Sequence, residues 1–90
     1  MSRAFVNEDA DGATPRRYYG LPPRNDPDFD RAAAQALLEG ARAGETASAE
    51  QATGYYWGER RLHPYVREIL DRAIDEGDDR MEQLAERFLS

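Results

Sequence analysis

The sequence predicts a small all-α protein, a four-helix orthogonal or antiparallel bundle that follows a flexible N-terminal arm. Apolar residues recur every three or four positions after residue 27, and no segment shows the period of two expected of a half-buried strand. Loops of about two to six residues separate these segments, which favours antiparallel neighbours around one core. The 90 residues suffice for one domain. We therefore assign residues 27–90 to the helical domain and residues 1–26 to the arm.

The arm has no apolar period, and its second half is rich in glycine and proline. Pro22-Pro23 favours local polyproline II, so we expect the arm to be extended or disordered unless something binds it. Its apolar residues suffice for folding onto a partner or back onto the helical domain. They are Phe5, Val6, Tyr18, Tyr19 and Leu21.

The first helix is expected to start at NDPDFD, residues 25–30. Asp26 suits the N-cap, and Pro27 suits the first helical position. Gly44 supplies a stop, whereas Gly40 inside the helix weakens its last turn by about 1 kcal/mol relative to alanine. The residues that recur on one face are Ala34, Leu37, Leu38 and Ala41.

A second, short helix is expected at Ser48-Ala49-Glu50-Gln51, which matches a capping box, and should end near Gly54 or Gly58. Three consecutive aromatic residues lie between these glycines. On a helix they would fan over about 200°, more than one buried face accepts. Continuing the helix face predicts Tyr56 and Trp57 in the core and Tyr55 at the surface.

Two further helices complete the bundle. The third is expected from His63-Pro64 to Gly77, and the fourth begins after a cap at Asp78 or Asp79. Both are amphipathic. The third carries Tyr65, Val66, Ile69, Leu70, Ala73 and Ile74 on its apolar face. The fourth carries Met81, Leu84, Ala85, Phe88 and Leu89.

The aromatic triplet is followed by arginines, a combination typical of interface hot spots. We interpret the segment as core together with an aromatic-arginine patch that binds a protein or peptide with acidic groups. The candidate binding residues are Tyr55, Trp57, Arg60, Arg61 and Tyr65, with Phe5, Tyr18 and Tyr19 from the arm. The alternative is a nucleic-acid- or transcription-associated regulator that contacts phosphates through Arg16, Arg17, Arg60 and Arg61.

Composition excludes several other functions. No cysteine is present, and His63 is the only histidine, so a thiolate metal site, a histidine pair and a catalytic triad are ruled out. No phosphate-binding glycine motif occurs. The acidic run around Gly77 lacks the ligand order of an EF-hand, and a helix end followed by a helix cap explains it better. We therefore expect no catalytic activity, metal or cofactor.

Charge narrows the set of partners. Eighteen acidic residues face 12 basic ones, all of them arginine, which gives a net charge of -6. This composition is typical of a GC-rich genome, and adaptation to a salt-rich cytoplasm is a compatible alternative. It argues against broad attachment to polynucleotides or anionic lipid. Without an apolar leader or membrane span, we expect a cytoplasmic protein.

The opening MSRAFVNEDADG resembles the leader of some bacterial relatives of the Gre transcription elongation factors, over about a tenth of the chain. The resemblance implies that Arg3, Ala4, Phe5 and Val6 form a docking segment toward the transcription machinery. The long coiled coil and the β-rich domain of that family have no counterpart here, so no catalytic residue carries over.

Taken together, these patterns predict a non-catalytic interaction module with an unknown protein partner. It is expected to be a monomer or a weak homodimer, the latter if Phe88 and Leu89 remain exposed.

Overall fold

The computed structural model describes residues 19–90, and this part of the chain is helical and contains no strand. Its elements are α1 (Phe29–Arg42), α2 (Thr46–Thr53), the 3-10 turn η2 (Arg60–Leu62), α3 (His63–Glu76) and α4 (Asp79–Leu89). The predicted all-α class is confirmed. None of these helices combines the length and the apolar character needed to cross a bilayer.

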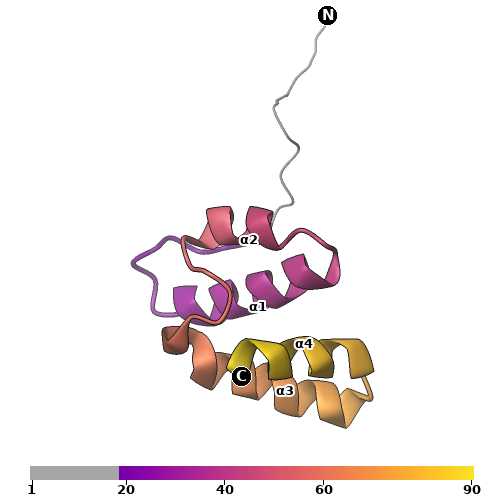
Figure 1. The fold of residues 1–90 in the computed structure, drawn as a ribbon. Coiled ribbons are helices and arrows are strands. Elements are labelled where there is room, and N and C mark those ends of the chain that lie inside the picture. Colours follow the sequence, from indigo (N-terminus) through magenta and orange to yellow (C-terminus); the bar gives the residue numbers. More distant parts are fainter. Residues whose placement is uncertain (1–18) are drawn as a thin grey trace, which may run out of the picture.

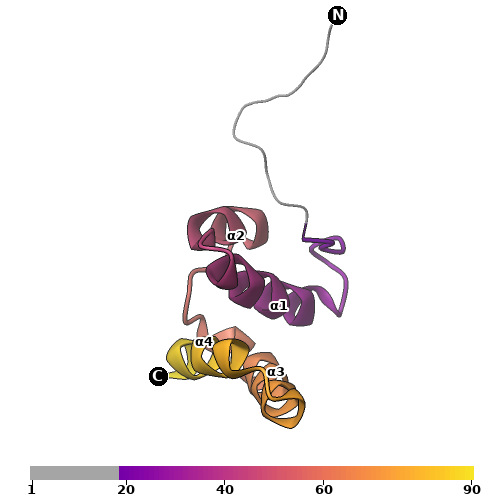
Figure 2. The same ribbon diagram turned by 90° about the vertical axis from the view of Figure 1, so that its right-hand side faces the viewer.

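The four helices form two helical hairpins, with α1 between its partner α2 and the α3–α4 pair (Figure 1). A view at right angles shows the same order, α2 on one side of α1 and the second hairpin on the other (Figure 2). α1 contacts all three other helices. Half of its residues are therefore buried: Phe29, Ala33, Ala34, Ala36, Leu37, Leu38 and Gly40.

The start of α1 differs from the prediction. The helix begins at Phe29 rather than Pro27, and no side chain caps it. The carboxylate of Asp26 accepts the backbone N–H of Asp28 at 2.8 Å, and its carbonyl accepts that of Phe29 at 3.0 Å. Aspartate stabilises such local turns as readily as it caps helices, so the turn precedes the helix here.

Gly40 is a close-packing position between α1 and α2, and not the weak point that its helix propensity predicts. A Cβ at Gly40 would lie 2.7 Å from the Cβ of Ala49 and 3.2 Å from the carbonyl oxygen of Glu45. Helices approach this closely only where side chains are small. Gly40 therefore lets α2 lie directly against α1.

The predicted capping box at the start of α2 is wrong. The helix begins at Thr46, so Ser48 lies inside its first turn, and no side chain caps it. Its end agrees with the prediction, since Gly54 terminates it in the left-handed conformation at φ +78°. That conformation is accessible to glycine without steric cost.

The second hairpin matches the prediction closely. α3 runs from His63 with proline at its second position, Gly77 ends it at φ +71°, and the Asp78 carboxylate caps α4 by accepting the Met81 N–H at 3.2 Å. The predicted apolar faces are buried at Val66, Ile69, Ala73, Met81, Leu84, Ala85 and Phe88. Ile74, however, is 53% exposed.

Phe88 has no exposed surface, and Leu89 is half-buried against the core. The condition that we set for a homodimer at the C-terminus, exposure of both residues, is therefore not met.

Part of the predicted arm lies within the described residues. Tyr19 and Leu21 are half-buried and pack against the core formed by the helices. Phe5, Val6 and Tyr18 lie outside the described range, as do Arg16 and Arg17.

Candidate interaction surface

The aromatic triplet occupies a loop, residues 54–59, and not a helix. Because Gly54 ends α2, the periodicity used to orient the three side chains does not apply. Tyr56 is 77% exposed, whereas Tyr55 and Trp57 on either side are half-buried against the core. The predictions that Tyr56 is a core residue and Tyr55 the surface residue were wrong. The side chain of the middle residue thus faces solvent, while those of its two neighbours face the core.

Tyr55 is anchored at both its ring and its backbone. Its hydroxyl donates a 2.7 Å hydrogen bond to the Asp30 carboxylate, and its ring lies 6.3 Å from that of Phe29. Its backbone N–H donates to the hydroxyl of Thr53 at 3.1 Å, and Thr53 is fully buried. The hydrogen bond to Asp30, with partial burial, raises the pKa of Tyr55 above its ordinary value.

Trp57 anchors the other side of the loop. Its ring meets that of Phe88 edge to face at 4.9 Å, and its backbone N–H donates to the Glu50 carboxylate at 2.9 Å. A turn follows, in which the N–H of Glu59 donates to the carbonyl of Tyr56 at 3.1 Å and Gly58 adopts φ +88°. A positive φ at this turn position favours glycine. Tyr56 therefore projects from a loop held on both sides.

His63, the first residue of α3, contacts the end of the loop. Its Nε2 lies 3.3 Å from the carbonyl oxygen of Gly58, and its ring lies 6.0 Å from that of Phe88. Its position at the helix start agrees with the prediction, and its ring also serves packing and loop closure.

The two predicted arginines both lie exposed in η2, directly after the loop. The guanidinium of Arg61 lies near the hydroxyl of Tyr55 and the Asp30 carboxylate, and these two groups, Tyr55 first, raise its pKa. The backbone N–H of Arg61 is capped by the Glu59 carboxylate at 3.3 Å. The carbonyl of Arg60 accepts the backbone N–H of His63, but its side chain has no hydrogen-bond or ion-pair partner among residues 19–90. One exposed cation, four residues after Tyr56 in the chain, therefore has no partner in the part of the chain that the structure describes.

A third arginine reaches the same loop from the segment before α1. Arg24 donates a 2.7 Å hydrogen bond to the carbonyl of Thr53, and its guanidinium lies over the ring of Phe29 at 5.2 Å. It also contacts Gly54, where a Cβ would overlap it. No local sequence pattern indicates this placement, because Arg24 stands in the predicted arm next to two prolines.

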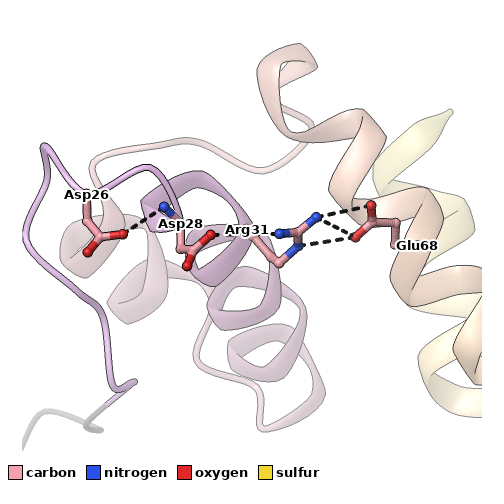
Figure 3. A network of polar contacts seen from close by, with 4 residues as sticks. All are labelled: Asp26, Asp28, Arg31 and Glu68. Carbon is pink, nitrogen blue, oxygen red and sulfur yellow. Dashed lines mark hydrogen bonds and ion pairs between the residues drawn. The ribbon is translucent and has the colours of Figure 1, made fainter.

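Tyr65 belongs to a different surface. Its ring faces the guanidinium of Arg31 at 5.2 Å, on a groove of about 330 Å³ between α1 and α3. Arg31 in turn donates to both carboxylate oxygens of Glu68 at 3.2 Å, and approaches Asp28 at 3.8 Å (Figure 3). These bonds raise the pKa of Arg31, with the Glu68 hydrogen bond as the main cause.

The groove continues along α1 and α3 as a second hollow of about 160 Å³. A second ion pair between the hairpins, Arg42 with Asp78 at 2.8 Å, lies at this end. Gln35, Ile69 and Arg72 line both hollows. Sequence reasoning missed the groove, because it exists only where two helix faces meet.

Of the arm residues predicted to bind, only Tyr19 is described. Its hydroxyl is buried near Gly40 and has no hydrogen-bond partner within residues 19–90. Tyr19 therefore packs the α1–α2 junction in this structure. Phe5 and Tyr18 lie outside the described residues.

Comparison with known proteins adds no assignment, because no family model, curated protein or solved structure matches this chain significantly. The resemblance of the first residues to Gre-type leaders stays a prediction. Within residues 19–90, no group of three or more histidine, aspartate or glutamate side chains is arranged to hold a metal ion.

Proposed function

We propose that the protein is a small non-catalytic protein-interaction module that binds an acidic segment of a partner protein through the surface around Tyr56. This Tyr56 surface consists of Tyr56, Arg60, Arg61 and Arg24. The observation that carries the proposal is the 77% exposure of Tyr56 between two neighbours, Tyr55 and Trp57, that pack against the core.

An exposed aromatic side chain on a fixed loop suits binding. Tyrosine is enriched at interface hot spots, and it buries on the order of 150 to 250 Å² of surface when a partner covers it. Ordering a mobile loop on binding costs free energy, about 0.5–1.5 kcal/mol for each immobilised side chain. Here the hydrogen bonds of Tyr55 and Trp57 already hold the loop, so that cost is small.

The charges beside Tyr56 favour a carboxylate-bearing partner. The side chain of Arg60 is exposed and has no partner within residues 19–90. Arg61 lies near the hydroxyl of Tyr55, and Arg24 contacts Thr53 and Gly54, so both arginines flank the residues that precede Tyr56. A protein segment fits better than a polynucleotide, because the chain as a whole carries a charge of -6. Nucleic-acid binding is the competing hypothesis.

The test is partner recovery from a lysate of the source organism with the full chain as bait. Tyr56→Ala should abolish recovery of the specific partner, because it removes the central contact. Ile74→Ala is the matched control, since Ile74 is the other large exposed apolar residue of the described chain and lies on α3. Circular dichroism should show both variants folded. Equal recovery by Tyr56→Ala and wild type would refute the proposal.

A salt series and nuclease treatment separate the two hypotheses. Polynucleotide binding should weaken steeply with salt and disappear with nuclease, whereas an aromatic-centred protein contact should change little. Removal of residues 1–18 tests the arm separately. If this deletion alone loses the partner while Tyr56→Ala retains it, the arm and not the Tyr56 surface is the binding element.

A further inference from the structure

Arg24 joins two segments that are far apart in the chain. It precedes α1, yet its Nη2 donates to the carbonyl of Thr53, the last residue of α2, at 2.7 Å. The same guanidinium covers the ring of Phe29 and contacts Gly54. These contacts involve the residues that lead directly into Tyr55 and Tyr56.

We propose that Arg24 is a positioning residue for the Tyr56 surface, which fixes the direction in which Tyr56 projects. The role in binding rests on the proposed function, whereas the contacts of Arg24 with Thr53 and Phe29 do not depend on it. Gly54 turns the chain out of α2, and the guanidinium of Arg24 holds the carbonyl just before that turn. The exit direction of residues 54–56 thus depends on a side chain from outside the loop.

Helix physics explains why this position needs a cation. The last carbonyls of a helix have no intrahelical partner and form the negative end of its dipole. α2 has only eight residues and no basic residue in its last turn. Arg24 supplies both the missing donor and the complementary charge.

The chemistry also requires arginine rather than any cation. A planar guanidinium can donate to the Thr53 carbonyl while its face stacks on Phe29. The ammonium of lysine carries the charge but cannot stack in this way. Gly54 complements the arrangement, because any Cβ there would occupy the space of the guanidinium.

The experiment measures amide hydrogen exchange of the full chain by NMR for wild type and Arg24→Lys. Arg67→Lys is the matched control, an exposed arginine on α3 without a partner among the described residues. In Arg24→Lys the amides of Gly54, Tyr55 and Trp57 should exchange about five- to tenfold faster, the factor expected for one net hydrogen bond. Amides of α3 and α4 should be unchanged.

Local acceleration in Arg24→Lys, with reduced partner recovery, supports the proposal. Unchanged exchange at residues 54–57 overturns it, and so does equal acceleration throughout α3 and α4, which would make Arg24 a general stability residue. The two proposals fail separately. If Tyr56→Ala retains the partner, the proposed function falls, while the exchange data still decide what Arg24 does.

Discussion

The two helical hairpins of this domain are held together by opposite means. α3 and α4 bury large side chains, with Phe88, Leu84 and Val66 at their centre, and the Asp78 carboxylate caps α4. α1 and α2 instead meet where side chains are almost absent, at Gly40 and Ala49, and neither helix has a side-chain cap. The first arrangement depends on bulk, and the second depends on its absence.

The difference between the hairpins accounts for where the candidate interaction surface lies. The α3–α4 hairpin is a self-consistent amphipathic unit. The short α2 relies on outside groups, the guanidinium of Arg24 and the ring contacts of the loop that follows it. The exposed Tyr56 lies in this externally supported part of the domain. Binding residues are frequently found on loops that a rigid scaffold positions.

The largest effect is expected from Phe88→Ala, which breaks the bulk-dependent hairpin. Phe88 is fully buried and supports both Trp57 and His63. Truncation should reduce the free energy of unfolding by about 3–5 kcal/mol, measured by urea denaturation. The control Ile74→Ala should stay within about 0.5 kcal/mol of wild type.

A Phe88→Ala loss of less than about 1 kcal/mol would contradict the central role of this ring. It would mean that Trp57 and its neighbours collapse into the vacated space.

An intermediate effect is expected from Gly40→Ala, which adds bulk to the other hairpin. Helix propensity alone predicts a gain of about 1 kcal/mol. The contact of 2.7 Å with the Cβ of Ala49 predicts instead a loss of about 1–3 kcal/mol, because α2 must move away. Denaturation of the single variant decides between the two signs.

The double variant Gly40→Ala, Ala49→Gly sharpens the result. It removes the methyl that the new Cβ meets, so it should recover part of the stability after allowance for glycine in α2. Strict additivity of the two changes would show that the two positions are not in contact.

The smallest effect is expected from Asp78→Asn, which alters the cap and its link to α1. The hydrogen bond from Arg42, and then the backbone N–H of Met81, lower the pKa of Asp78. Because the pKa of Asp78 is lower in the folded than in the unfolded chain, its ionised carboxylate stabilises the fold fully at a pH above the unfolded pKa of about 4. This contribution is lost as the pH falls through the folded-state pKa. The wild-type advantage over Asp78→Asn should therefore be constant between about pH 5 and 7 and shrink below about pH 4. An advantage independent of pH would exclude the charge as its source.

The sequence predicted the second hairpin almost completely, because its signals are local. Large apolar residues at helical spacing, proline at the start and glycine at the end each act within a few residues. The first hairpin was predicted only in outline. Whether Gly40 weakens a helix or permits close packing depends on Ala49 across the junction, which no local pattern reveals.

The candidate interaction surface was half predicted for a similar reason. Arg60 and Arg61, proposed as binding residues from the sequence, are exposed in the turn directly after the aromatic triplet. Tyr56 was assigned to the core because the helix was continued through Gly54, where the chain in fact changes direction. Arg24 and the groove near Tyr65 involve segments tens of residues apart, so only the folded structure brings them together.

The central position of α1 also shapes how this domain can evolve. Ala33, Ala34 and Ala36 are already buried, and they belong to α1, which lies between α2 and the second hairpin (Figure 2). Even a hydrophobic replacement there introduces volume for which no room exists. We consequently expect the fewest tolerated substitutions along this alanine-rich stretch and the most on the outer faces of α3 and α4. Within the stretch, the size of the replacing side chain should limit substitution more than its polarity.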